Sequence, residues 1–117
     1  MIDQCNRIED HLRYYGEEEE TFKENWRFQD NVILNLERIG EAANNLPGGL
    51  ILRHPEINWS GIIGIRVTIA HHYWRLDMDL IWITAAQEVP KLKAMLESIL
   101  GELEEAKREK YQCGIDD

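Results

Sequence analysis

Cysteine is scarce in this sequence, and the positions of the two cysteines exclude the sites that cysteine usually builds. Cys5 and Cys113 stand near opposite ends of a chain of 117 residues. Two cysteines without a close spacing form neither a zinc site nor a disulfide framework. We therefore expect no metal bound through cysteine, and a cytoplasmic protein whose thiols stay reduced.

Long apolar runs and a signal peptide are also lacking, so neither a membrane-spanning segment nor export is expected. The length of the chain indicates a single domain over residues 1–117. With 44% hydrophobic residues it can bury one modest core, and small helical domains often complete such a core by pairing with a second copy.

Positive charge is in short supply overall but not everywhere. The chain has 13 basic and 22 acidic residues, a formal net charge of −9, and a uniformly acidic surface repels nucleic acid. Residues 51–76, however, contain Arg53, Arg66 and Arg75 against Glu56 alone, a local balance of +2. This basic island can attract an anion locally, while the acidic body suits a basic protein partner.

Apolar residues recur at steps of three and four in segments 2–15, 26–46 and 77–103, which predicts amphipathic helices. The run at 59–73 is apolar on most sides, and we interpret it as a buried central helix. Its β-branched residues also permit a strand, but no second strand-like run exists to pair with it. The prediction is an all-α, up-down bundle of four main helices.

Local signals predict where these helices begin and end. Gly16 can end the first helix, while Asn25, Asn58 and Asp77 can cap the following three. Residues 50–57 are expected to form a connection, and Pro90 to kink the last helix or restart it at its first turn. From about residue 105 to 117 the tail should fray.

The most reactive side chains gather in one stretch, Gly64–Trp74, which contains Arg66, His71, His72 and Tyr73. Arginine stays charged and can grip a phosphate or stabilise a pentavalent transition state. Histidine can take and give a proton near neutral pH. RNA carries its own nucleophile, the 2′-hydroxyl, so cleavage by such a pair needs no metal. A tyrosine there can bind phosphate, stack on a base or become modified.

Structural explanations of the same residues stay open at this point. Cations at a helix end favour the negative pole of the helix dipole, which accounts for His72 and Arg75 and is one of two explanations for Arg66. Tyr73 and Trp74 are typical packing residues.

The pattern Arg-x4-His-x-Tyr, here Arg66, His71 and Tyr73, resembles the signature of the HEPN superfamily and, more narrowly, of its HepT-like group. Further segments resemble the same group in register over roughly residues 1–100: residues 29–30 and 35–43, residues 54–59, and residues 73–74 followed by Asp77 and residues 81–82. Arg-x4-His alone is a weak pattern, and the ordered set is much more specific.

The resemblance implies an all-helical homodimer in which the motifs of both subunits face a shared cleft. It implies a metal-independent endoribonuclease without cofactors, acting as the toxin of a type II toxin–antitoxin system. The partner is a minimal nucleotidyltransferase that adenylylates the motif tyrosine, here Tyr73. By the same resemblance, Arg66 stabilises the transition state and His71 is the general acid and base.

The chain departs from the family pattern beside the arginine. The family usually has a polar residue there, most often asparagine, where this sequence has Val67. Loss of that group predicts reduced nuclease activity. His72 stands where the family often has glycine and adds a second imidazole. The alternative function is therefore a non-catalytic HEPN dimer that binds a nucleotidyltransferase or a nucleotide.

Overall fold

The computed structural model describes the backbone of residues 1–115 and the side chains of residues 1–110, and every regular element in that part of the chain is a helix. The all-α prediction is confirmed. The elements are α1 (Ile2–Tyr15), α2 (Glu19–Glu24), α3 (Trp26–Asn44), α4 (Gly48–Arg53), α5 (Trp59–His72), the 3₁₀ turn η1 (Tyr73–Arg75), α6 (Met78–Ile83), the π-helical segment η2 (Thr84–Glu88) and α7 (Val89–Ile115).

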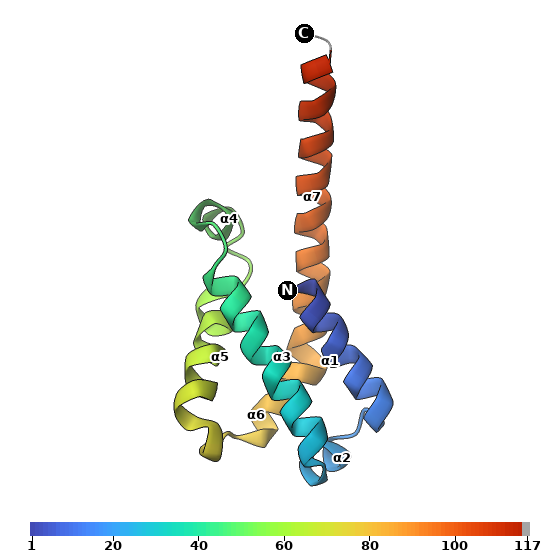
Figure 1. Ribbon diagram of the computed structural model, residues 1–117, viewed down its shortest axis with the longest axis vertical. Helices are drawn as coiled ribbons and strands as arrows, with labels where there is room; N and C mark the ends of the chain where they lie inside the picture. Colours follow the sequence, from blue (N-terminus) through green and yellow to red (C-terminus); the bar gives the residue numbers. More distant parts are fainter. Residues whose placement is uncertain (116–117) are drawn as a thin grey trace.

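The long helices run alternately up and down, and α3 lies in the middle of them (Figure 1). It packs against α1 on one side and against α5 on the other, while α1 also contacts α7. The sequence-based assignment of the third helix as the buried centre is therefore wrong. Helix α5 buries only Trp59 and Ile69, because one of its sides packs on α3 and the others remain open.

Short-range signals place the helix boundaries as predicted. The Asn25 side chain accepts hydrogen bonds from the backbone amides of Arg27 and Phe28 at 3.0 and 3.1 Å, which satisfies two of the four free donors of α3. Asn58 and Asp77 cap α5 and α6 in the same manner. Gly16 ends α1 with φ of 105°, a left-handed conformation that costs glycine little.

Two connections differ from the sequence-based prediction or refine it. Residues 50–57 are predicted to form a connection, but the first four of them belong to the short helix α4 (Gly48–Arg53). Pro47 is suited to precede its first turn, and Leu50 and Ile51 pack against the core. Pro90 lies in the first turn of α7, as predicted. The π turn η2 directly before it provides the wider backbone that a missing proline N–H and a bulky ring require.

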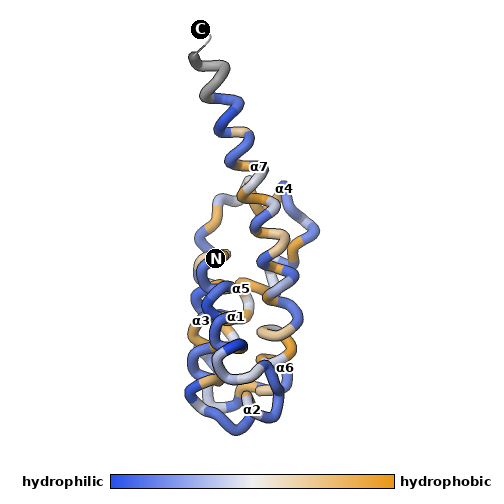
Figure 2. The backbone as a smooth tube through the Cα atoms, turned by 90° about the vertical axis from the view of Figure 1, so that its right-hand side faces the viewer, coloured by the Kyte–Doolittle hydropathy of each residue, from blue (hydrophilic) through white to orange (hydrophobic). Residues whose placement is uncertain are grey.

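The last part of α7 extends beyond the other helices (Figure 1). With this extension included, the longest dimension of the molecule is 61 Å. Its residues from Leu100 to Lys110 are exposed and predominantly hydrophilic (Figure 2). The backbone stays helical to Ile115, within the stretch expected to fray, and residues 116–117 lie outside the described part. The side chain of Cys113 lies outside it as well.

Candidate functional site

A close contact between α3 and α5 fixes where the motif lies. A Cβ atom on Gly40 of α3 would come within 2.9 Å of the carbonyl oxygen of Ile62 and 3.2 Å of the backbone nitrogen of Arg66. Only a glycine lets the two backbones approach so closely. The first residue of the motif thus lies directly against the C-terminal part of α3.

Arg66 is held by a carboxylate from α3. Its Nη1 donates a hydrogen bond to Oε2 of Glu41 at 2.8 Å, and both side chains keep substantial contact with solvent. The Nε atom of Arg66 is buried and has no hydrogen-bond partner among the described residues. The guanidinium is therefore oriented by one ion pair while part of its donor fork remains unused.

Tyr73 is held by a second carboxylate from the same helix. Its hydroxyl donates a hydrogen bond to Oδ1 of Asp30 at 3.0 Å, and the side chain is 43% exposed. The hydrogen bond to Asp30, together with the negative charge of that carboxylate, raises the pKa of Tyr73 above its usual value of about 10. The phenol is thus kept neutral and accessible at the surface.

His71 and Val67 lie on a different side of α5. The helix continues to His72, so Arg66 and His71 both project from one regular helix. At about 100° per residue, His71 projects about 140° around the helix from Arg66. His71 and Val67 are exposed, Val67 at 46%, and Trp74 beyond them is 93% exposed. One chain alone therefore presents the arginine and the histidine of the motif toward different directions.

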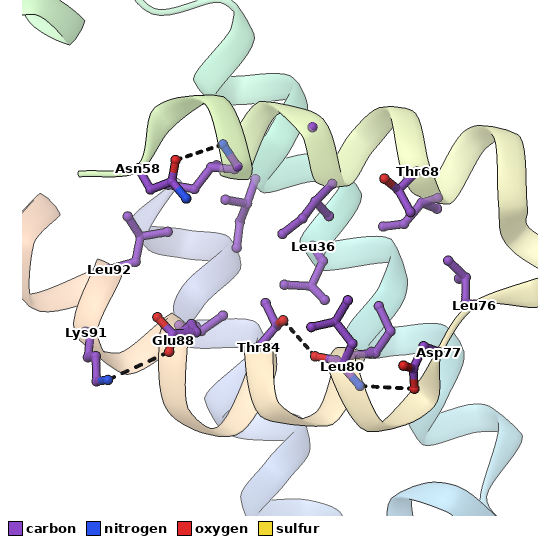
Figure 3. A pocket seen from close by; sticks show the side chains of 18 of the residues that line it. Leu36, Asn58, Thr68, Leu76, Asp77, Leu80, Thr84, Glu88, Lys91 and Leu92 are labelled. Atoms are coloured by element: carbon purple, nitrogen blue, oxygen red, sulfur yellow. Dashed lines mark hydrogen bonds and ion pairs between the residues drawn. The ribbon is translucent and has the colours of Figure 1, made fainter. Parts of the chain in front are cut away.

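His72 occupies a third side of α5, where it lines a groove of about 720 Å³. The groove lies between α5 and the run from α6 to α7, with Leu36 of α3 at its back (Figure 3). Its lining is mostly aliphatic, and Thr68, Thr84 and Glu88 contribute polar groups (Figure 3). Arg66, Val67 and His71 are not part of this lining. The predicted auxiliary residue His72 is thereby separated from the predicted catalytic pair.

The basic island of the sequence does not form a basic patch in space. Arg53 ends α4 and Arg75 ends η1, so they flank a helix of 14 residues, about 21 Å long. Arg66, between them, is paired with Glu41. The local net charge of +2 that the sequence suggests is offset, because α3 places the carboxylates of Glu41 and Asp30 against Arg66 and Tyr73.

Sequence reasoning missed Asp30, Glu41 and Gly40, the three residues of α3 that contact the motif. A weak signal was available: residues 30, 37 and 41 are acidic and fall on one stripe of a helix by their spacing. Nothing in the sequence stated that this stripe faces α5, because that depends on how the two helices pack.

Potential metal ligands are dispersed over the described residues, and the Cys5 thiol is buried. No group of three or more His, Cys, Asp or Glu side chains within residues 1–110 is placed to hold a metal ion. Burial raises the pKa of the Cys5 thiol to about 11, which keeps it protonated and unreactive. No helix in the described backbone is both long and apolar enough to span a membrane.

What the arrangement offers is a charged donor fork in the middle of α5, an exposed imidazole near its end and an accessible phenol directly after it. Arginine and histidine are suited to phosphate binding and proton transfer, and the phenol can bind or receive a phosphoryl-type group. The neighbouring Trp74, with its ring 5.4 Å from that of Tyr73, offers a free aromatic surface for a base.

Comparison with known proteins agrees with this chemistry. The family model described as "Ribonuclease HepT-like" matches residues 1–99. A protein of Methanocaldococcus jannaschii named "Putative RNase MJ0127" is 34% identical over 83 residues, which cover 71% of this chain and 69% of that protein. A second from that organism, named "Putative RNase MJ0125", is 35% identical, with 74% of each chain covered.

A relative from a second organism also has a ribonuclease name. The protein of Thermococcus cleftensis named "Probable ribonuclease HepT" is 37% identical over 68 residues, which are 58% of this chain and 62% of that protein. No solved structure matches the chain with significant similarity.

Proposed function

Because the chain belongs to the HepT-like ribonuclease family, we propose that it is an endoribonuclease whose catalytic residues are Arg66 and His71. The observation that carries this proposal is the state of Arg66. Its side chain is 33% exposed, and Glu41 orients the guanidinium through Nη1. Such a group is ready to bind a phosphate oxygen.

In the reaction that we propose, His71 takes the proton from an RNA 2′-hydroxyl, and the oxygen then attacks the adjacent phosphorus. Arg66 stabilises the pentavalent, negatively charged transition state. The bond to the 5′-oxygen breaks, and that oxygen receives a proton from an imidazolium. Because the substrate supplies the nucleophile, the reaction requires no metal ion.

A homodimer fits the angular separation of Arg66 and His71. The two side chains diverge by about 140° within one chain, so a single phosphate meets both more easily in a cleft to which two copies contribute. The exposed side of α5 that carries Val67 and His71, together with Trp74 of η1, is available for such a cleft.

The proposed cellular role is that of a cytoplasmic toxin in a type II toxin–antitoxin system. Its antitoxin is a minimal nucleotidyltransferase that transfers an adenylyl group to Tyr73. The exposure of Tyr73, on the turn that follows the catalytic helix, supports this part of the proposal. A bulky charged group on that hydroxyl blocks the approach of RNA by bulk and by like charge.

The test compares two adjacent histidines. Purified protein should cut single-stranded RNA in the presence of EDTA, and His71→Ala should reduce the rate by roughly 100-fold or more, as removal of a general acid–base does. His72→Ala is the matched control, since His72 faces the groove, and should keep most of the activity. Equal loss in both variants, or an inert wild type, contradicts the proposal.

The second candidate is a non-catalytic dimer that binds a nucleotidyltransferase or a nucleotide. Two observations favour it: the exposed Val67 in place of a polar side chain, and the engagement of Arg66 by Glu41. Val67→Asn separates the two candidates. A strong gain of RNA cleavage over a nearly inert wild type supports the binding module, whereas ready cleavage by the wild type refutes it.

A further inference from the structure

The contact between Tyr73 and Asp30 joins two segments that are far apart in the chain. Asp30 lies in the second turn of α3, and Tyr73 lies directly after α5. The start of α3 is tightly fixed: Asn25 caps it, and Nε2 of Gln29 donates to the carbonyl oxygens of Phe22 and Lys23, each at 3.0 Å. Asp30 therefore contacts the phenol from a helical turn whose position is fixed by these hydrogen bonds.

The direction of this hydrogen bond matters for chemistry at Tyr73. The phenol donates and the carboxylate accepts, across 3.0 Å. Because the neighbouring carboxylate raises the pKa of Tyr73, the phenol keeps its proton at neutral pH. Any reaction in which this oxygen acts as a nucleophile must therefore remove that proton during the step.

We propose that Asp30 is the general base for nucleotidylation of Tyr73. The inference rests on the proposed function, in which Tyr73 accepts a nucleotidyl group. The oxygen of Tyr73 attacks the α-phosphorus of a nucleoside triphosphate, an O–P bond forms, and the bond from that phosphorus to the pyrophosphate oxygen breaks. The phenolic proton passes to Asp30, and pyrophosphate leaves.

A carboxylate is adequate for this task although it is a weak base in isolation. The attacking hydroxyl becomes much more acidic as its bond to phosphorus forms, and protein kinases use an aspartate to receive the substrate hydroxyl proton in the same way. Asp30 is the carboxylate that is hydrogen-bonded to the Tyr73 hydroxyl, whereas Glu41 is paired with Arg66 and His72 faces the groove.

The experiment measures transfer rather than RNA cleavage. The full-length chain is incubated with a minimal nucleotidyltransferase of the proposed antitoxin type, Mg²⁺ and ATP, and its intact mass is followed with time. Asp30→Asn is the decisive variant, because its side-chain oxygen still accepts the hydrogen bond from Tyr73 but cannot take the proton. We expect the maximal transfer rate to fall roughly 100-fold or more while KM for ATP is unchanged.

Two further variants complete the design. Asp30→Glu keeps a carboxylate and should recover part of the rate. Glu24→Gln removes an exposed carboxylate from α2, outside the contact, and should transfer at the wild-type rate. Transfer to Asp30→Asn at a rate within about threefold of the wild type overturns the role of Asp30 and leaves the proposed function standing. No transfer to wild-type Tyr73, or transfer to another residue, overturns both.

Discussion

At the scale of single residues, two carboxylates from outside the motif form hydrogen bonds with its arginine and its tyrosine. Asp30 holds Tyr73 and Glu41 holds Arg66, each through one hydrogen bond across the same helix pair. The two pairs differ in what they control. Glu41 sets the direction of a permanent cation, whereas Asp30 accepts a hydrogen bond from a phenol and raises its pKa.

The Asp30–Tyr73 pair makes a prediction about pH. The pKa of Tyr73 in the folded state is raised, so the contribution of this hydrogen bond to stability is present below pH about 10. It is lost as the pH rises through the raised pKa, because the phenolate is repelled by Asp30. In an ultraviolet absorbance titration, Tyr73 should ionise at higher pH than an unperturbed tyrosine, and Asp30→Asn should return it toward about 10.

The assignment in that titration comes from Tyr73→Phe, which removes one of the four tyrosines. The transition missing from its difference spectrum belongs to Tyr73. If this transition is centred at or below pH about 10 in the wild-type protein, the hydrogen bond to Asp30 does not persist in solution.

At the scale of helices, the close approach of α3 to α5 depends on the absence of a side chain at Gly40. Gly40→Ala gains about 1 kcal/mol in helix propensity, but its Cβ meets two backbone atoms that cannot rotate away. Overpacking of this kind costs about 1–3 kcal/mol, so we expect a net loss of about 1 kcal/mol in the free energy of unfolding. Urea denaturation measures the difference.

Gly64→Ala is the matched control for that substitution. Gly64 lies inside α5, the other helix of the pair, and a Cβ there meets no atom within 4 Å. This variant should be more stable than wild type by about 0.5–1 kcal/mol. A Gly40→Ala variant that gains stability like the control would show that the two helices can separate without cost.

Helix boundaries could be predicted from the sequence, whereas the environment of the site could not. Asn25, Asn58 and Asp77 cap helices through hydrogen bonds to residues two or three positions away. The helix boundaries therefore depend on residues that are close in the sequence. The place of α5 at the side of the bundle, and the carboxylates that face it, follow from packing between distant segments. The apolar residues around α5 suggested burial, but part of that surface lines an open groove.

The motif residues themselves could be identified from their order in the sequence, but their relative directions could not. Arg66 and His71 are five residues apart, and whether they converge depends on where α5 ends. The structure continues the helix past His71, which separates them. A similar limit applies to His72, whose neighbour in sequence is His71 but whose neighbours in space are the aliphatic residues of the groove.

At the scale of the whole molecule, charge determines how the protein can meet RNA. The chain carries a formal net charge of −9, and the cations nearest the motif are few and dispersed. Arg53 and Arg75 are exposed at opposite ends of α5, and Arg66 is shared with Glu41. Binding through a broad positive surface, as in many nucleic-acid-binding proteins, is not available to one copy of this chain.

This charge distribution predicts a shallow salt dependence for RNA binding. Each phosphate contact contributes about −0.7 to the slope of log affinity against log salt concentration for a single strand, so three arginines give at most about −2. The measurement is fluorescence anisotropy of labelled single-stranded RNA with His71→Ala, which binds without cutting. Arg75→Gln should make the slope less negative by about 0.7, while Arg13→Gln, on α1 and paired with Asp10, should leave it unchanged. A slope steeper than about −4 would exceed what these three arginines give even when both copies of the proposed dimer contribute them, and would contradict binding through them.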